Sequence, residues 1–406
     1  MNDKRLHRNL VLAVINALDE IFNDDKYADR VVNKTLKIDK RWGARDRKFI
    51  AESIYDSVRW KRLYNEISGI KGHYIRPNLW RFFAVQLVLK GYTLPDWKQF
   101  EGTPVRRIKG KFDSLQDNRA LRESIPDWMD KLCATELGEK KWTRELAALN
   151  ETAPVVLRVN TLKSSKSDLK AQLEAEDIIT EEIEGYPDAL LLTERANVFK
   201  TQAFKKGLFE MQDASSQLVA AYLEIKPGMR VVDTCAGAGG KSLHMASLME
   251  NKGQLIALDI YESKLQDLKK RAKRNSAHNI ETRTITSNKT IKKLKESADR
   301  VLIDAPCSGL GVLKRNPDSK WKLQAEFLER IKKTQAEILD SYSQIVKPGG
   351  KLVYATCSIL PSENEEQVEQ FLKNHPEFEF VSENKVSAYE SGFDGFYMAL
   401  LQKKQK

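Results

Sequence analysis

The chain has 406 residues, of which 41% are hydrophobic and 31% charged, and its net charge at pH 7 is +11. Domains usually hold about 100–200 residues, so we expect two or three with sizeable cores. No apolar run reaches the ~20 residues that span a bilayer. The four cysteines (Cys133, Cys235, Cys307 and Cys357) show neither CxxC spacing nor a nearby histidine. We therefore expect no disulfide framework, no bound metal and no membrane association, and reduced thiols in a cytoplasmic protein.

The positive charge is concentrated in two blocks. Residues 1–150 carry 30 basic and 21 acidic side chains, and residues 251–350 carry 21 and 12. The intervening and final segments, 151–250 and 351–406, have net charges of −4 and −3. Two separate basic blocks suit a polyanion such as a nucleic acid, and a solvated lysine-rich surface would give the same composition.

Residues 1–120 have the periodicity of helices. Apolar residues three and four apart recur in RDRKFIAESIYDSVRWKRLYNEI and in LWRFFAVQLVLKGY. The first apolar stretch, LVLAVINAL, has the same spacing and no small-residue cleavage site after it, so it predicts an amphipathic helix and not a signal peptide. A short linker is expected around 110–124, followed by two short helices over 127–134 and 140–149.

The rest of the chain mixes strands and helices. In residues 125–210 the pattern predicts a strand at 155–160, a helix at 166–175 and strand-like runs at 178–183 and 189–193. Over 211–406, short β-branched runs alternate with helical stretches, which indicates a parallel, doubly wound α/β sheet. The strands are expected at 230–235, 254–259, 283–286, 300–305, 351–357 and 396–402, and the helices at 241–250, 262–275 and 322–346. Ser362 and Glu365 predict a capping box for the following helix.

A glycine-rich loop, DTCAGAGGKS (233–242), joins the first of these strands to its helix. Glycines there let a ligand approach the backbone, and the helix N-terminus favours an anionic group. A Walker A loop needs glycine where Cys235 stands, and a dehydrogenase loop prefers one at Ser242. Asp259 ends the second strand, where it can bind the ribose of S-adenosylmethionine or of NAD. The loop therefore indicates a nucleotide cofactor and leaves its identity open.

Two cysteines and an aspartate follow the next two strands. Asp304 and Cys307 come after the fourth strand, and Cys357 comes after the fifth. A single free cysteine is usually a small buried hydrophobe. If the two strands are neighbours, however, both thiols face the crevice at the carboxyl ends of the strands, where ligands bind.

These groups suit the methylation of C5 of cytosine. A thiolate that adds to C6 makes C5 nucleophilic, an acid held at N3 offsets the charge on the ring, and a second thiol assists release of the product. Asp304 would need a dry pocket to hold the proton for this role. The chemistry alone does not say which thiol is the nucleophile.

Several stretches resemble motifs of the Sun-type RNA cytosine-5 methyltransferase family. The main ones are DTCAGAGGK, IDAPCSGLGVLKRNPD and YATCSILPSENEEQVEQFL, and the paired PCS and TCS motifs are specific to that family. VVLRVNTLK, GLFEMQDASSQL and DGFYMALL resemble its other blocks, so that the resemblance covers roughly 125–403. RDRKFIAESIYDSVRW is similar to the NusB-like domain of the family's bacterial 16S ribosomal RNA enzyme.

The resemblance implies three parts. They are an all-helical NusB-like RNA-binding domain (1–120), a small α/β RNA-recognition subdomain (125–210) and a Rossmann-like class I methyltransferase domain (211–406). By the same resemblance Cys357 is the nucleophile, Cys307 assists product release and Asp304 contacts the base.

S-adenosylmethionine is the implied cofactor. Arg158 and Asn160 match RNA-contacting positions of the small subdomain. The residues implied to bind the cofactor are Cys235, Ala236, Gly237, Ala238, Gly239, Gly240, Lys241, Asp259, Lys264, Asn288 and Asp304.

The chain departs from the family pattern at several positions. Gly237 and Ala238 replace alanine and proline of the usual CAAPGGK loop, so we expect a more flexible loop. Lys264 stands where arginine is usual, Asn288 where aspartate is usual, and Asn316 where histidine is common. The reacting groups remain, so we expect an active monomer that methylates cytosine in RNA, with 16S ribosomal RNA implied by the N-terminal resemblance.

Two other interpretations stay open. An NAD(P)-dependent oxidoreductase would explain the glycine-rich loop and would give the PCS and TCS motifs no role. A non-catalytic RNA-binding ribosome assembly factor would explain the two basic blocks and the altered loop.

Overall fold

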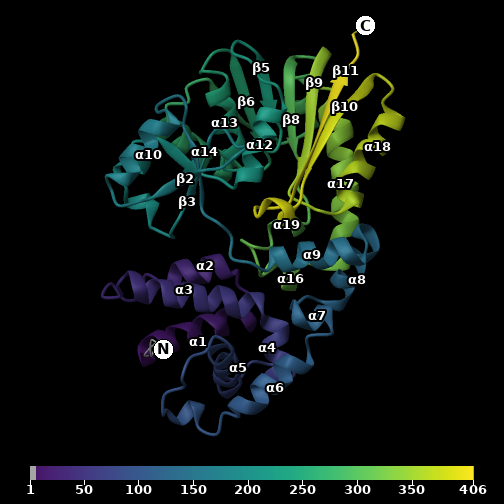
Figure 1. Cartoon of the computed structure of the whole chain (residues 1–406). Coiled ribbons are helices and arrows are strands. Elements are labelled where there is room, and N and C mark those ends of the chain that lie inside the picture. Colours follow the sequence, from purple (N-terminus) through teal and green to yellow (C-terminus); the bar gives the residue numbers. More distant parts are fainter. Residues whose placement is uncertain (1–5, 406) are drawn as a thin grey trace. The chain divides into compact units, whose positions relative to one another are not determined.

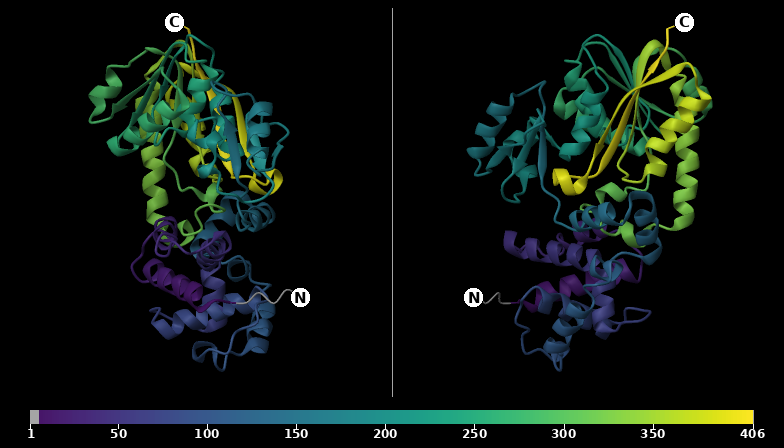
Figure 2. Two further views of the ribbon diagram at one scale, coloured as in Figure 1. Left: turned by 90° about the vertical axis from the view of Figure 1, so that its left-hand side faces the viewer. Right: turned by 45° about the vertical axis from the view of Figure 1, so that its right-hand side comes forward.

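The computed structural model describes residues 6–405, which pack as two compact units (Figures 1 and 2). The first unit contains the residues up to Asn150 together with Leu313–Leu323. The second contains Glu151–Val312 and the chain from Gln324 onward. Among the described residues, no helix has both the length and the apolar character needed to cross a bilayer.

The first unit is entirely helical. Its helices are α1 (Arg8–Phe22), α2 (Ala28–Thr35), α3 (Ala44–Arg59), α4 (Lys61–Ser68), α5 (Arg76–Leu89), α6 (Val105–Ser114), α7 (Arg119–Arg122), α8 (Asp127–Leu137), α9 (Glu139–Leu149) and α16 (Ser319–Lys322), with a 3-10 turn η1 (Lys98–Phe100). The predicted amphipathic helix is confirmed as α1. Aromatic side chains fill the core: the ring centroids of Phe22, Tyr64 and Tyr74 lie 5.5, 5.5 and 6.1 Å from that of Phe82.

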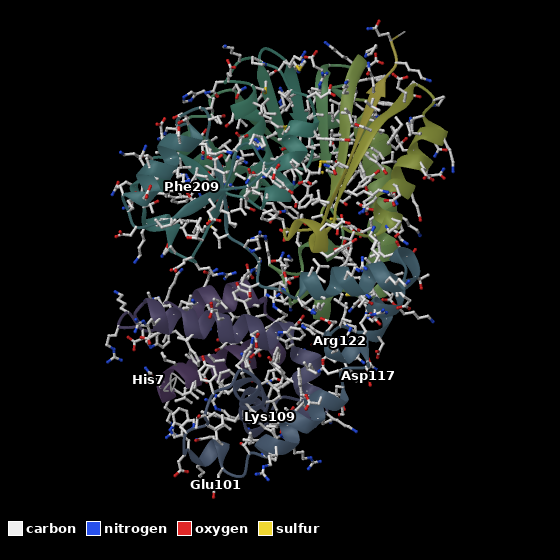
Figure 3. All side chains as sticks on the ribbon, in the orientation of Figure 1. His7, Glu101, Lys109, Asp117, Arg122 and Phe209 are labelled. Carbon is white, nitrogen blue, oxygen red and sulfur yellow. The ribbon has the colours of Figure 1, made fainter. Side chains whose placement is uncertain are left out.

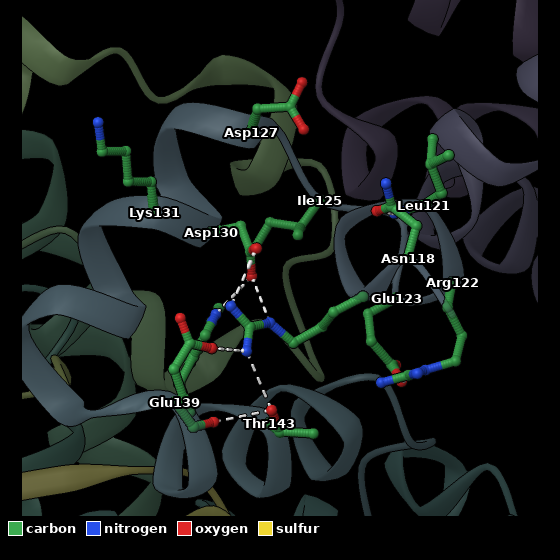
Figure 4. A network of polar contacts seen from close by, with 12 residues as sticks. Asn118, Leu121, Arg122, Glu123, Ile125, Asp127, Asp130, Lys131, Glu139 and Thr143 are labelled. Carbon is green, nitrogen blue, oxygen red and sulfur yellow. Dashed lines mark hydrogen bonds and ion pairs between the residues drawn. The ribbon is translucent and has the colours of Figure 1, made fainter. Parts of the chain in front are cut away.

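The linker expected around 110–124 is wrong, because α6 continues to Ser114 and α7 follows it. Arg119 explains how so short a helix as α7 is held in place; its partners Asp130, Glu139 and Thr143 are labelled in Figure 4. Its Nε donates to Asp130 Oδ1 over 2.8 Å, its Nη1 donates to Thr143 Oγ1 over 3.1 Å, and it forms an ion pair with Glu139. These partners are on α8 and α9, so tertiary contacts stabilise α7 where the local pattern predicts no helix.

The segment Leu313–Leu323 is held in the first unit by a buried lysine. Lys320 is fully buried, and its Nζ lies 3.4, 3.2 and 3.2 Å from the carbonyl oxygens of Arg59, Glu123 and Ser124. Burial lowers the pKa of Lys320 to about 7. The polypeptide that carries Cys307 therefore continues, a few residues later, into the core of the helical unit.

The second unit begins with a small antiparallel sheet of order β2-β3-β1-β4. Its elements are β1 (Val156–Val159), α10 (Lys166–Glu174), β2 (Thr180–Glu182), β3 (Ala189–Leu192), the 3-10 turn η2 (Val198–Lys200), α11 (Gln202–Lys205) and β4 (Phe209–Met211). The predicted helix and the three predicted strands are confirmed, and β4 was not predicted. Phe209, labelled in Figure 3, is fully buried in the core of this sheet.

The large sheet has the order β10-β11-β9-β8-β5-β6-β7. Its strands are β5 (Arg230–Asp233), β6 (Gln254–Asp259), β7 (Ile280–Thr284), β8 (Ala298–Asp304), β9 (Val346–Thr356), β10 (Phe378–Val386) and β11 (Phe396–Lys403). Strands β5 to β9 are parallel, as predicted, but β11 is antiparallel to both of its neighbours. The sheet is therefore mixed and Rossmann-like, and the wholly parallel prediction is wrong at this edge.

Helices cover both faces of the large sheet (Figure 1). They are α12 (Ala214–Tyr222), α13 (Gly240–Leu248), α14 (Glu262–Asn275), α15 (Asn288–Lys292), α17 (Ala325–Ser343), α18 (Glu365–Asn374) and the short α19 (Ala388–Ser391), with 3-10 turns η3 (Leu310–Val312) and η4 (Pro361–Glu363). Because side chains alternate along a strand, Val231 packs with α12 to α14, whereas Val232 packs with α17 and α18. The predicted capping box is not formed, since Ser362 lies in η4 and α18 begins after Asn364.

Candidate active site

The glycine-rich loop lies where predicted, between β5 and α13. Gly237 and Gly239 have φ of 55° and 88°, in the left-handed region that favours glycine. A Cβ atom on Gly239 would lie 2.5 Å from the side chain of Leu268, so this position also requires a residue without a side chain. No atom lies within 4 Å of a Cβ built on Gly237, which leaves the loop open on that side.

Side chains from outside the loop fix its backbone. Gly237 N donates to Asp259 Oδ2 over 2.8 Å. Arg271 Nη1 donates to the carbonyl oxygen of Ala238 over 2.7 Å, and Arg158 Nη1 donates to that of Gly240 over 2.6 Å. Two guanidinium groups therefore hold carbonyl oxygens of the glycine-rich loop.

Arg158 and Asn160, the predicted RNA contacts, are buried on and after β1, each 1% exposed. Burial lowers the pKa of Arg158 to about 10. Asn160 Nδ2 donates to the carbonyl oxygens of Gly207 and Asn275, over 2.7 and 2.9 Å. In this arrangement both side chains join the small sheet to the domain of the large sheet and offer no surface to RNA.

Glu210 of β4 completes this junction. Its carboxylate accepts a hydrogen bond from Arg271 Nη2 over 2.9 Å, and Arg274 and Asn275 also donate to it. Neither Glu210 nor Arg271 was predicted from the sequence as a functional residue. The sequence signal that could have indicated this junction is the acidic Glu210 inside the short apolar strand FEM, since a buried acid needs a cationic partner.

Asp233 lies at the end of β5, at the start of the glycine-rich loop. Its carboxyl is buried; Oδ2 accepts from Ser242 Oγ over 2.6 Å, while Oδ1 has no hydrogen-bond partner. Burial raises the pKa of Asp233 to about 7. An unpartnered buried acceptor beside an open glycine loop, with Asp259 at the neighbouring strand end, fits a nucleoside cofactor that also carries a cationic donor. S-adenosylmethionine has both features.

Lys264 and Asn288 are exposed. Lys264 Nζ lies 4.8 Å from the ring centroid of Tyr261, the residue that precedes α14. Asn288 is the first residue of α15, beyond the end of β7. No described contact joins either side chain to the glycine-rich loop, and their cofactor roles stay predictions.

Asp304, at the end of β8, forms an ion pair with Lys241 of the glycine-rich loop. Lys241 Nζ donates to Asp304 Oδ2 over 2.7 Å, and the two side chains are 13% and 27% exposed. Burial acts against the charged form of Lys241, but the charge and hydrogen bond of Asp304 raise its pKa. The proton that Asp304 is expected to hold in a dry pocket stays a prediction, and the described partner of the carboxyl is the Lys241 ammonium.

The two thiols meet beside this ion pair. Strands β8 and β9 are adjacent and parallel, with Asp304 paired to Ala355, so the residues that follow them reach the same place. Cys307 Sγ lies 3.3 Å from Cys357 Sγ, and both residues are partly buried. The hydrogen bond with Cys357, burial and nearby negative charge raise the pKa of Cys307.

The other two cysteines have different surroundings. Cys133 is fully buried in α8 of the helical unit. Burial, together with the charges of Asp233 and Asp304, raises the pKa of Cys235. Neither is suited to act as a nucleophile, so the site offers one pair of thiols, one carboxylate with its ammonium and one open glycine loop at the same edge of the sheet.

Comparison with known proteins agrees with this arrangement. The family described as 16S rRNA methyltransferase RsmB/F matches residues 220–402, and the ferredoxin-like domain of RsmF/B-like methyltransferases matches residues 125–199. The chain is 34% identical over 328 residues to a probable ribosomal RNA small subunit methyltransferase B of Bacillus subtilis, covering 75% of this chain and 72% of that protein. A similarly named protein of Synechocystis is 33% identical over 315 residues, covering 73% and 71%.

Solved structures share the fold. The crystal structure of PH0851 superposes with a TM-score of 0.84 at 25% identity, covering 99% of this chain and 100% of that one. A methyltransferase homologue from Pyrococcus horikoshii gives a TM-score of 0.63 at 27% identity, covering 71% and 99%. The chain therefore belongs to the 16S rRNA methyltransferase RsmB/F family.

Proposed function

We propose that this methyltransferase transfers a methyl group from S-adenosylmethionine to C5 of a cytosine in 16S ribosomal RNA, through a covalent bond between Cys357 and C6 of the base. The observation that carries the proposal is the 3.3 Å separation of the Cys307 and Cys357 sulfurs at the strand edge that also holds the glycine-rich loop. The names of the relatives support ribosomal RNA as the substrate class.

The two thiols have different roles in this proposal. Cys357 adds as a thiolate to C6, which places a new carbon–sulfur bond on the ring and makes C5 nucleophilic. Cys307, whose pKa is raised, keeps its proton in this proposal and so is the donor in the 3.3 Å contact between the two sulfurs. S-adenosylmethionine, when bound, supplies the methyl group. A water molecule then takes the C5 proton, the carbon–sulfur bond breaks and the N3 proton returns to the Lys241–Asp304 pair. Cys357 departs as a thiolate, which the thiol of Cys307 stabilises by a hydrogen bond.

Lys241 and Asp304 face the polar edge of the base in this proposal. Asp304 contacts the ring at N3, and Lys241 keeps a positive charge within hydrogen-bonding distance of that carboxylate. The pair offsets the negative charge that builds up on the ring when the thiolate adds. The proton for N3 then comes from the ion pair.

RNA binding is assigned to the helical unit and the small sheet. We propose that residues 1–120 form a NusB-like domain that docks structured RNA, with the small α/β subdomain holding the substrate strand near a flipped-out cytosine. The basic surplus of residues 1–150 supports this. Arg158 and Asn160 contribute to RNA binding indirectly, because they hold the small α/β subdomain in place.

Bisulfite mapping of 16S ribosomal RNA from cells with and without the protein tests the proposal. One cytosine should resist conversion only when the protein is present, and purified protein with labelled S-adenosylmethionine should restore that mark. Bound NAD without methyl incorporation would favour an oxidoreductase. RNA binding without methyl incorporation would favour an assembly factor.

A further inference from the structure

A buried carboxylate connects the two cysteine turns. Glu363, in the 3-10 turn η4, is 0% exposed. It accepts hydrogen bonds from Ser308 N over 2.8 Å, from Ser308 Oγ over 2.5 Å and from Gln335 Nε2 over 3.0 Å, and Ser358 Oγ also donates to it. Ser308 directly follows Cys307, and Ser358 directly follows Cys357. One side chain therefore holds both turns.

The carboxylate is satisfied by neutral donors alone. Among residues 6–405, no lysine, arginine or histidine lies within ion-pairing distance of Glu363, although Lys241 neutralises Asp304 nearby. The four hydrogen bonds come from neutral groups, so they place no positive charge beside the carboxylate. That charge acts on the adjacent Cys307, whose pKa is raised by the hydrogen bond with Cys357, by burial and by the charges of Cys357 and Glu363.

The titratable groups that face Cys307 lie on β9, on the turn after it and on η4. Cys357 and Tyr354 belong to β9 and the turn after it, and Glu363 belongs to η4. Lys241 of α13 acts on Cys357, and the charge of Cys357 in turn raises the pKa of Lys241. A negative group thus acts on Cys307, and a positive group acts on Cys357.

We propose that Glu363 is a positioning residue that sets the separation of the two sulfurs and keeps the proton on Cys307, so that the single thiolate of the pair forms at Cys357. The consequence for catalysis rests on the proposed function. The effect of Glu363 on the pKa of Cys307 is independent of the proposed function, because it exists in the free protein without RNA or cofactor.

The test is alkylation of Cys307 by iodoacetamide as a function of pH, read by mass spectrometry of its peptide. Cys357→Ala removes the competing thiol and serves as the reference background. Adding Glu363→Gln keeps the shape of the side chain and removes its charge, so the midpoint of Cys307 alkylation should fall by about one pH unit, equal to a tenfold faster reaction below the midpoint. The control is Glu365→Gln. It removes a nearby acid, two residues after Glu363, that pairs with Lys385, and it should leave the midpoint of Cys307 alkylation unchanged.

An unchanged midpoint in Glu363→Gln, or an equal shift in Glu365→Gln, would overturn the proposal. If Glu363→Gln does not fold, Ser358→Ala provides the second test, since the carboxylate then loses one donor and keeps its charge. The midpoint should stay or rise in that variant, and a fall would contradict the role of the charge. Alkylation needs neither RNA nor cofactor, so failure here and failure of the methylation assay are separate outcomes.

Discussion

Cys307 and Cys357 are fifty residues apart in the chain, yet their sulfur atoms lie 3.3 Å apart. The contact follows from the pairing of β8 with β9, which brings the ends of two parallel strands together. Two thiols that act on a single pyrimidine ring must both approach the same edge of the base. Sulfur atoms at this distance can do so.

The first prediction separates the roles of these thiols. Cys357→Ala should lower methylation by at least about 10³-fold and form no adduct, because the nucleophile is gone. Cys307→Ala should accumulate a covalent protein–RNA adduct, visible on a denaturing gel, because addition survives while release fails. Cys133→Ser, a change in the helical unit, should retain methylation. Adduct-free inactivity in both active-site variants would contradict the division of labour.

The second prediction concerns the ion pair of Lys241 and Asp304. Lys241→Met and Asp304→Asn should each lower kcat/KM by roughly 10²-fold, because each leaves the other charge without its partner in a half-buried site. The double variant should be little worse than either single variant, since the pair acts as one unit. Losses that add independently in this double-mutant cycle would mean that the two residues serve separate steps.

The third prediction addresses the support of the glycine-rich loop. Arg158→Met removes the donor to the Gly240 carbonyl, so the Kd for S-adenosylhomocysteine should rise by about tenfold, measured by calorimetry, while RNA affinity stays within about twofold. Hydrogen exchange of residues 235–241 should accelerate. Arg195→Met is the control, since Arg195 donates to the carbonyl of Ala153 in the same subdomain. Equal losses of cofactor and RNA affinity would indicate general unfolding of the subdomain.

Much of the large sheet could be predicted because its strands are buried on both faces. The run QLIALD at 254–259 and the helix at 262–275 are confirmed residue for residue, since a continuous apolar run and a 3.6-residue period leave few alternatives. The edge of the sheet was harder to predict. β10 (Phe378–Val386) alternates exposed charged residues as an edge strand does, and a half-exposed polar run gives no clear signal.

The buried polar residues show where sequence reasoning stops. Arg158, Glu210, Lys320 and Glu363 each occupy the interior because partners far away in the chain satisfy them. A charged side chain is normally exposed, and nothing in its local sequence distinguishes the rare one that meets several backbone carbonyls or hydroxyls. The glycine-rich loop and the two cysteines were found because their residue types are themselves chemically unusual at the ends of strands.

The fourth prediction concerns RNA docking by the helical unit. Arg106, Arg107 and Lys109 are exposed on α6. Replacing all three with glutamine should weaken RNA binding and lower the slope of log Kd against log salt by about 2, because each phosphate contact contributes roughly 0.7 with single strands. S-adenosylhomocysteine affinity should not change. Lys373→Gln, which removes an exposed lysine of α18, should alter neither quantity. An unchanged salt slope in the triple variant would move the RNA surface away from α6.

The last prediction uses the pKa of Asp233, which burial raises to about 7 from an ordinary value of 3.8. Between about pH 4 and 7 the folded protein holds a proton that the unfolded chain has released, so this residue lowers the free energy of unfolding as pH rises, by at most about 1.4 kcal/mol per unit. Above pH 7 both states are ionised and the effect levels off. Asp233→Asn removes the titration, so the stability of the wild type relative to this variant should fall from pH 4.5 to 6.5, measured by urea unfolding. Asp267→Asn, a change at an exposed site on α14, should give a nearly parallel curve. A parallel curve for Asp233→Asn as well would mean that the carboxyl is ionised throughout, with a cation or water at its unpartnered oxygen.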